Sequence, residues 1–152
     1  MSISAEQVKE LRDKTGISVM ECKKALEEAA GDMDRAIALL KERSASLVIK
    51  KQDRELGAGV VSSYVHTTGQ VGALVLLSCE TDFVSKNEGF SALARDVAMH
   101  VAAMRQQDIP TLLTESFIKD TSKTIADLLS GATQKFGERV EITQVTFFSV
   151  LG

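Results

Sequence analysis

The fold is decided by residues 60–77, VVSSYVHTTGQVGALVLL, where the sequence changes from helical to strand-like periodicity. Two apolar segments, Val60–Thr67 and Val71–Leu77, flank the turn residues Thr68-Gly69-Gln70. This pattern predicts two strands joined in an antiparallel hairpin. Charge density changes at the same place, because residues 1–55 hold 11 Lys or Arg and 11 Asp or Glu, whereas residues 56–152 hold 7 and 10. The hairpin therefore opens a second, more apolar part of the chain.

The region after the hairpin returns to helical spacing and then ends in a third strand. An amphipathic helix opened by Asn87 is predicted from the apolar positions Phe90, Leu93, Ala94, Val97, Val101 and Met104. Ser122 is expected to cap a second helix that Gly137 ends, and Pro110 falls in the connection before it. Residues 139–151 are β-rich, with a phase shift near Thr143-Gln144 that predicts a bulge. The order ββααβ predicts an α+β domain over residues 57–152, with a three-stranded antiparallel sheet and helices on one face.

The region before the hairpin contains three helix start signals. Ser4 with Gln7 forms a capping-box pattern, Ser18 with Glu21 repeats it, and Asp32 is placed to cap a third helix. Gly16 and Gly31 are suited to end the first two helices. The sequence therefore predicts a three-helix module over residues 1–43, followed by a linker over residues 44–56 that lacks strong apolar periodicity.

Composition excludes several classes of protein. The chain has 152 residues, 44% of them apolar, and a net charge of -3, which provides no general positive field for nucleic acid. No apolar run approaches the length of a membrane span, and no secretory signal is recognisable at the start. Two cysteines cannot form a disulfide framework and fit a reducing compartment such as the cytoplasm.

Catalytic and metal-binding chemistry is poorly represented. His66, His100, Cys22 and Cys79 are ligand types, but no two of them have metal-ligand spacing. No glycine loop follows a strand and opens a helix, so no phosphate-binding loop is predicted. A Cys79–His pair would lack an orienting third group. We therefore expect no cofactor, no metal and no catalytic residues, and we expect the histidines to have structural roles.

The segment Thr81-Asp82-Phe83-Val84 is the most unusual in the chain. It follows an apolar strand and precedes a helix cap, so it is expected in a surface connection. Two interpretations remain open at this point. Phe83 could pack into the core while Thr81 or Asp82 caps a turn. Alternatively, Phe83 and Asp82 could form an aromatic and acidic contact for a partner protein, since aromatic side chains often dominate interfaces.

Three blocks of sequence resemble the bacterial translation elongation factor Ts family, in its compact form. The first comprises VKELRDKTG at 8–16 and MECKKAL at 20–26. The second extends from Tyr64-Val65-His66 through CETDFV at 79–84 to AMHVA at 98–102. The third is FGERV at 136–140. The blocks follow the family's order over nearly the whole chain, and the first two are highly specific.

This resemblance implies both a fold and a function. The implied fold is a ubiquitin-associated-like helical module, a linker and a core of antiparallel sheet and helices. The implied function is guanine-nucleotide exchange on elongation factor Tu, in its GDP-bound and nucleotide-free forms, with the TDFV block entering near the partner's Mg²⁺ and phosphate site. The residues implied to bind that partner are Thr81, Asp82, Phe83, Val84, Met20, Cys22, Lys23, Phe136 and Gly137.

The chain also departs from the family's pattern. Ser78 and Arg139 stand where the family commonly has Asn, and the chain is shorter than compact members around Pro110–Thr114. Compact members act as homodimers, so the resemblance implies a homodimer here as well, without nucleic acid or membrane as a partner. The alternative function is a ubiquitin-associated-like adaptor without exchange activity.

Overall fold

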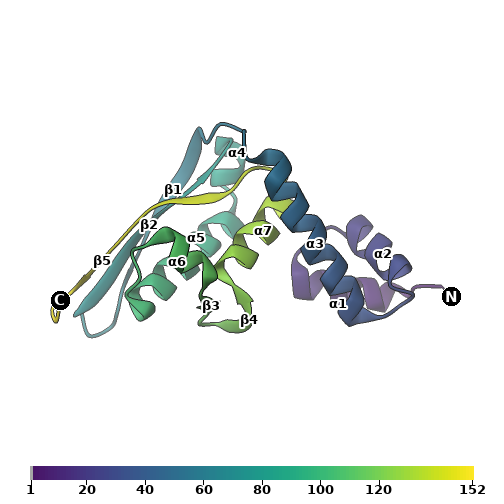
Figure 1. Ribbon diagram of the computed structural model, residues 1–152, viewed down its shortest axis with the longest axis horizontal. Helices are drawn as coiled ribbons and strands as arrows, with labels where there is room; N and C mark the ends of the chain where they lie inside the picture. Colours follow the sequence, from purple (N-terminus) through teal and green to yellow (C-terminus); the bar gives the residue numbers. More distant parts are fainter. Residues whose placement is uncertain (1) are drawn as a thin grey trace. The chain divides into compact units, whose positions relative to one another are not determined.

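The computed structural model describes residues 2–152, which divide into two compact units. The first unit comprises the chain up to Gln52 together with Ser130–Gly137. The second comprises Asp53–Leu129 and Glu138–Gly152. Figure 1 labels the helices and strands along the chain.

The first unit is built from three consecutive helices, α1 (Ala5–Thr15), α2 (Val19–Glu28) and α3 (Met33–Lys51). Each begins at the residue predicted from the sequence. Ser4 and Gln7 form a complete capping box, Ser18 accepts from the N–H of Glu21, and Asp32 accepts from the N–H of Arg35. Such caps satisfy N–H groups that have no partner inside the helix. The apolar faces meet in a core that includes Leu11, Leu26 and Leu40.

Helix α3 is longer than the sequence predicted. The linker expected from residue 44 is helical as far as Lys51. Ser44 is buried, and its hydroxyl donates to the backbone carbonyl of Leu40, four residues earlier in the helix. No Gly or Pro interrupts residues 33–56, so the helix has no sequence-encoded end where weak apolar periodicity suggested one.

The second unit contains a three-stranded antiparallel sheet in the order β1-β2-β5. Its strands are β1 (Ala58–Val65), β2 (Val71–Cys79) and β5 (Glu141–Ser149). Strand β1 was predicted at Val60–Thr67, so it begins two residues earlier than predicted and includes Gly59. A Cβ atom at Gly59 would lie 2.5 Å from the carbonyl oxygen of Leu77, so the close strand pairing requires glycine there.

The predicted bulge is present in β5. Leu76 pairs with Gln144 and Leu77 with Ile142, which leaves Thr143 without a direct partner in the ladder. The extra residue changes which side chains face each side of the sheet. Phe147 thereby faces the same side as Ile142, and Phe148 faces the other side.

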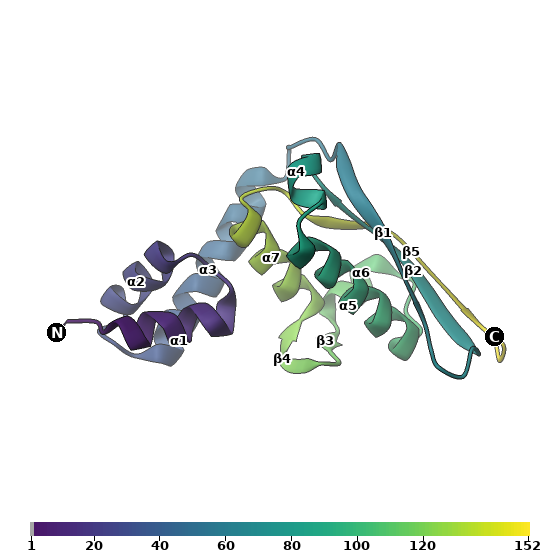
Figure 2. The same cartoon turned by 180° about the vertical axis from the view of Figure 1, so that it is seen from behind.

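Helices cover one face of the sheet, as predicted (Figure 2). Helix α5 (Glu88–Met104) begins at the predicted cap Asn87 and packs against β1 and β2. Its buried positions include Phe90, Val97 and Val101, which recur at helical spacing. Helix α6 (Ile109–Thr114) packs against β5. The α+β class predicted from the sequence is confirmed.

The region between α5 and β5 differs from prediction. Pro110 lies in the first turn of α6 rather than in an irregular connection. Ser122 is part of a second, two-stranded sheet formed by β3 (Ser116–Phe117) and β4 (Asp120–Thr124), so it does not cap a helix. Helix α7 (Ile125–Phe136) instead begins with a reciprocal pair of hydrogen bonds between Thr124 and Asp127. Gly137, at φ +72°, ends it as predicted.

Candidate functional site

The TDFV segment forms a single turn of helix directly after strand β2. This turn, α4 (Asp82–Ser85), has Thr81 as its N-cap. The carbonyl oxygen of Thr81 accepts the N–H of Ser85, at 3.2 Å. A helix this short has little stability of its own, so its conformation depends on what holds Thr81.

The exposure of this segment distinguishes the two interpretations of its sequence. The side chain of Phe83 is 88% exposed, and Asp82 is exposed beside it. Val84 and Ser85 are buried, and they anchor the turn to the second unit. Phe83 therefore does not pack into the core. The segment exposes an aromatic ring next to a carboxylate, while the buried side chain of Val84 holds the turn against the core.

Two glutamates hold this turn, and we call Glu80 and Glu138 the glutamate clamp. One carboxylate oxygen of Glu138 accepts the backbone N–H groups of Glu80 and Thr81, at 3.1 and 3.0 Å. Its second oxygen accepts the hydroxyl of Thr81, at 2.6 Å. In return, the carboxylate of Glu80 accepts the backbone N–H of Arg139, at 2.6 Å.

The sequence analysis included Glu138 in a block that resembles the family and predicted no role for it. The clamp joins residues nearly sixty positions apart, and no local sequence pattern predicts such a pairing. Its one local signal is Gly137, whose left-handed backbone ends α7 immediately before Glu138.

Cys79 adds another hydrogen bond to Thr81. Its thiol donates to the carbonyl oxygen of Thr81, at 3.3 Å. Burial raises the pKa of the Cys79 thiol, and the nearby carboxylate of Glu138 raises it further. The thiol is therefore protonated at neutral pH, which suits a hydrogen-bond donor and disfavours a nucleophile.

The two histidines are bonded elsewhere. His100 is fully buried, with its Nε2 atom 3.0 Å from the carboxylate of Glu115 and its Nδ1 atom accepting the N–H of Ile118. The Nδ1 atom of His66 lies 3.1 Å from the hydroxyl of Tyr64. Neither ring is hydrogen-bonded to Cys79, so the pairing needed for a thiol nucleophile is not formed.

A second candidate surface lies on the first unit, where α1 meets the start of α2. A groove there has Ile3, Val8 and Val19 among its lining residues. Its charged lining is mainly basic, from Lys9, Arg12 and Lys23, with Asp13 as the acidic member. We call this the α1–α2 groove. Met20, the residue after Val19, is 66% exposed.

Cys22 does not belong to the exposed part of this surface. Its side chain is fully buried in the core of the first unit, where the sulfur donates to the carbonyl oxygen of Ile17. Burial also raises the pKa of the Cys22 thiol. The resemblance implied Cys22 among the partner-binding residues, and its side chain faces the core of the unit, one helical step away from the exposed Lys23. Lys23 remains exposed.

Phe136 and Gly137 end helix α7. Gly137 is exposed, and Phe136 is half-buried with the ammonium group of Lys135 5.4 Å from its ring centre. Both residues belong to the first unit, whereas Glu138, the next residue in sequence, belongs to the second.

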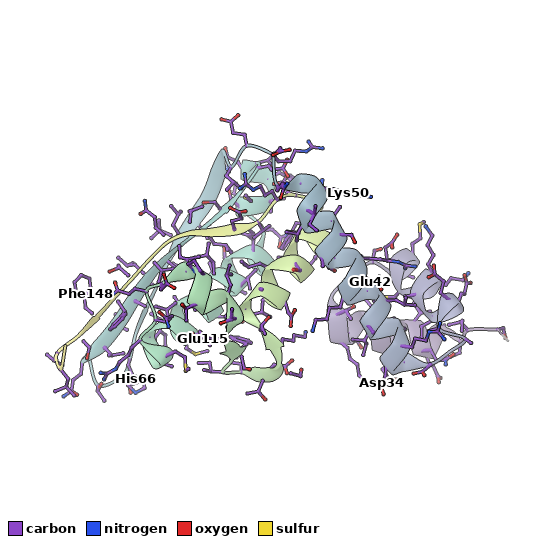
Figure 3. The ribbon with its side chains drawn as sticks, in the orientation of Figure 1. Asp34, Glu42, Lys50, His66, Glu115 and Phe148 are labelled. Carbon is purple, nitrogen blue, oxygen red and sulfur yellow. The ribbon has the colours of Figure 1, made fainter. Side chains whose placement is uncertain are left out.

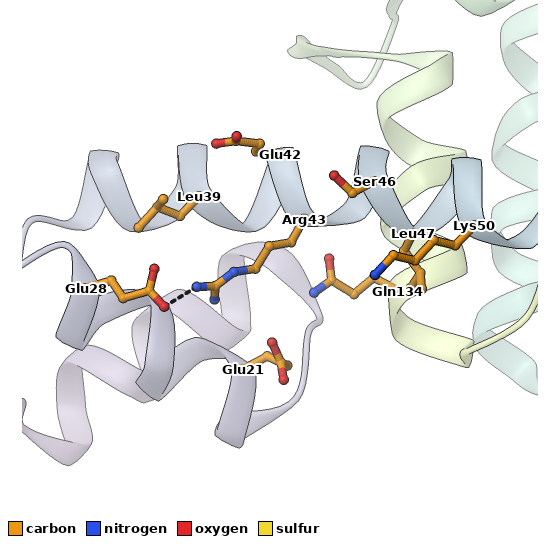
Figure 4. A pocket seen from close by; sticks show the side chains of 9 residues that line it. All are labelled: Glu21, Glu28, Leu39, Glu42, Arg43, Ser46, Leu47, Lys50 and Gln134. Carbon is orange, nitrogen blue, oxygen red and sulfur yellow. Dashed lines mark hydrogen bonds and ion pairs between the residues drawn. The ribbon is translucent and has the colours of Figure 1, made fainter.

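A hollow in the first unit, seen in Figure 4, carries mixed charge. Arg43 reaches from α3 and pairs with Glu28 of α2. Glu21 and Glu42 also line the hollow, together with Lys50 and Gln134. Three glutamates line the hollow against two cations, Arg43 and Lys50, and Arg43 is already paired, so the hollow is not suited to a phosphate group.

The face of the sheet opposite the helices exposes several apolar side chains. The cross-strand register places Val65, Gly72 and Phe148 in one row, and Val61 and Leu76 in another. Phe148 is 73% exposed and points away from the helices (Figure 3). We call this the outer sheet face, and its exposed apolar side chains are Val61, Val65, Leu74 and Phe148.

Within residues 2–152, no helix is both long enough and apolar enough to cross a membrane. In the same part of the chain, no three His, Cys, Asp or Glu side chains are grouped so that they could hold a metal ion.

Comparison with known proteins gives a consistent result. A family model described as Elongation factor TS matches residues 80–151. The Elongation factor Ts of Leptospira biflexa is 36% identical over 197 positions, with all of both chains covered. That of Thermosipho melanesiensis is 45% identical, with 90% of this chain and 77% of the relative covered. The Elongation factor Ts of Thermodesulfovibrio yellowstonii is 35% identical, with 99% of this chain and 97% of the relative covered. The 197 positions exceed the 152 residues of this chain, so the Leptospira protein has segments without a counterpart here.

Proposed function

The chain belongs to the elongation factor Ts family, and on that premise we propose that it promotes the release of GDP from elongation factor Tu. The observation that carries this proposal is the exposed ring of Phe83, which stands on a turn fixed by several hydrogen bonds. An apolar ring that is solvated in the free protein gains free energy when a partner covers it.

The proposed mechanism is insertion of the TDFV turn near the partner's Mg²⁺ and phosphate site. Mg²⁺ bridges phosphate oxygens and protein ligands, so disturbing its surroundings weakens the hold on GDP. Phe83 would displace side chains of the partner, and Asp82 would bring a negative charge toward the metal region. Thr81 and Val84 would keep the turn in place, because they face the clamp and the core.

Exchange by this route needs differential binding and no chemical step. A factor that binds the nucleotide-free partner more tightly than the GDP-bound partner weakens GDP binding by the same factor. We expect neither a cofactor nor a metal on this chain. We place its action in the cytoplasm, where two reduced, buried thiols are in keeping with the compartment.

The first unit supplies a second contact in this proposal. The α1–α2 groove combines apolar side chains with three basic ones, so it suits an acidic, partly apolar segment of the partner. Lys23 and Met20 are exposed there and are the side chains that we assign to the contact. We also assign Phe136 and Gly137 to partner binding, on the resemblance alone.

We further propose that two copies of the chain associate through the outer sheet face. Two antiparallel sheets pack well when apolar inner faces interdigitate. Val61, Val65, Leu74 and Phe148 provide such a face and have no covering element within residues 2–152.

Stopped-flow release of a fluorescent GDP from elongation factor Tu tests the proposed function. The chain should accelerate release at substoichiometric concentration, and the rate should saturate as its concentration rises. Binding to elongation factor Tu without faster GDP release would exclude the exchange activity and support elongation factor Tu as the partner. If the chain neither bound elongation factor Tu nor accelerated GDP release, the adaptor alternative would be favoured. Binding assays with ubiquitin-like proteins would then test that alternative.

A further inference from the structure

We propose that Glu138 is a positioning residue for nucleotide exchange, because it fixes the turn from which Phe83 projects. This inference rests on the proposed function, since it assigns a role to Glu138 in the action of that same turn. Glu138 is not itself placed against the partner.

The contacts of Glu138 are directed at the backbone of the turn. Its two oxygens accept three hydrogen bonds, two from N–H groups and one from the hydroxyl of Thr81. Hydrogen bonds to an ionised acceptor are stronger than neutral ones. No Lys or Arg forms an ion pair with Glu138 in the part of the chain that the structure describes. The carboxylate therefore serves the turn rather than a surface ion pair.

The clamp also restrains the backbone next to Glu138, so that its carboxylate stays close to Thr81. The N–H of the next residue, Arg139, donates to the carboxylate of Glu80. Each glutamate thus accepts a backbone N–H from the segment that carries the other. The preceding Gly137 adopts φ +72°, a conformation that favours glycine, and so sets where the chain leaves α7.

Phe83 needs this support because its ring is 88% exposed. An exposed side chain takes its direction from its backbone, and this backbone is one turn of helix. All the polar groups of Thr81 are engaged, through Glu138, Cys79, Val84 and Ser85. If the turn were mobile in the free protein, ordering it would cost conformational entropy during insertion.

The first test separates the rate of insertion from binding. Glu138→Ala removes all three acceptor contacts, whereas Glu138→Gln keeps one oxygen that can accept the two N–H groups. We expect Glu138→Ala to lower the maximal rate of GDP release about tenfold, the scale of one lost charge-assisted hydrogen bond. The half-saturating concentration should change little, because the α1–α2 groove is intact. Glu138→Gln should recover much of the rate.

A merely structural role would give a different result. Partial unfolding reduces the concentration of active factor, so it would shift the half-saturating concentration and leave the maximal rate unchanged. The matched control is Asp96→Ala, which removes an ion pair with Lys119 in the same unit. This control should keep the wild-type maximal rate.

The second test needs no partner. Amide hydrogen exchange in the free protein should become about tenfold faster at residues 80–86 in Glu138→Ala, while the strands keep their protection. Unchanged exchange there, or an equal rise throughout the unit, would overturn the proposal. An unchanged maximal rate in Glu138→Ala would also overturn it.

The two proposals fail in distinguishable ways. If the wild-type chain does not accelerate GDP release, the proposed function fails, and the exchange role of Glu138 fails with it, whatever the amide data show. If the wild type is active and Glu138→Ala matches its maximal rate, only the assignment of Glu138 fails.

Discussion

Phe83 is 88% exposed, whereas Val84, the next residue, is 4% exposed. The two apolar side chains of one short helical turn therefore have opposite environments. Val84 contributes to folding by leaving water, and Phe83 does not. Replacing Val84 should therefore lower stability. Replacing Phe83 should instead weaken the action of the protein on a partner that covers its ring.

Phe83→Ala should therefore reduce GDP release from elongation factor Tu and leave the protein stable. We expect at least a tenfold loss in the rate at saturating factor, the size typical of a lost aromatic anchor of about 2 kcal/mol. The melting temperature should stay within a degree or two of the wild type, because an exposed ring has little burial to lose. Stopped-flow release and a thermal melt give the two values.

Phe90→Ala is the matched control for that variant. Phe90 is fully buried in α5, so truncation should cost about 3–5 kcal/mol of unfolding free energy. A melting temperature of Phe83→Ala that falls as far as that of Phe90→Ala would show that Phe83 supports the fold.

Lys23→Ala should weaken binding to elongation factor Tu without changing stability. Lys23 is exposed beside the α1–α2 groove, and a charge at the rim of an interface acts mainly on the association rate. We expect a loss of affinity of about threefold to tenfold at low salt that shrinks as salt rises. Titration at two salt concentrations measures it. Lys24→Ala, which removes an exposed side chain paired with Glu21, should bind normally; equal losses in both variants would remove Lys23 from the site.

Leu74→Asp should convert the proposed dimer to a monomer. The substitution places a charge in the middle of the outer sheet face, where association would bury it. Light scattering should give about twice the 16.4 kDa of one chain for the wild type and the single-chain mass for the variant. Ile49→Asp, at an exposed apolar position in the first unit, should stay dimeric. A wild-type mass near that of one chain would refute the dimer.

The protein should lose stability at alkaline pH through its two thiols. Burial raises the pKa of Cys22 and of Cys79, so the unfolded chain releases these protons at a lower pH than the folded chain. Their contribution is therefore present below the unfolded thiol value of about 8.5 and is lost as pH rises through the folded values. Urea unfolding at pH 7 and pH 10 measures the fall, and Cys22→Ala/Cys79→Ala should show a smaller fall than the wild type.

Helix starts were predicted well where a cap and its partner lie three residues apart. Ser4 with Gln7, Asp32 and Asn87 all begin helices as expected. The failure at Ser122 has a related origin, because Thr124 with Asp127 offers an equally local signal, and Ser122 lies in β4 with its N–H and hydroxyl donating to Asp120. Local chemistry identified both candidates and did not choose between them.

Features that depend on distant partners could not be predicted. The glutamate clamp involves contacts that no short window contains. The exposure of Phe83 was open for the same reason, since an aromatic residue after a strand fits either a core or a surface. The division into a module at 1–43, a linker at 44–56 and a core domain at 57–152 stays a prediction.

The bulge at Thr143 makes strand β5 tolerant of one particular change in length. Thr143 is the residue without a direct partner in the ladder, so deleting it would restore strict alternation and leave Gln144, Phe147 and Phe148 on their present faces. A deletion between Gln144 and Phe147 that left the bulge in place would instead move Phe147 to the outer face and Phe148 toward the helices. Descendants of this sequence can therefore lose Thr143 and keep the pattern of β5, whereas a deletion farther along would have to be accompanied by a rewritten strand.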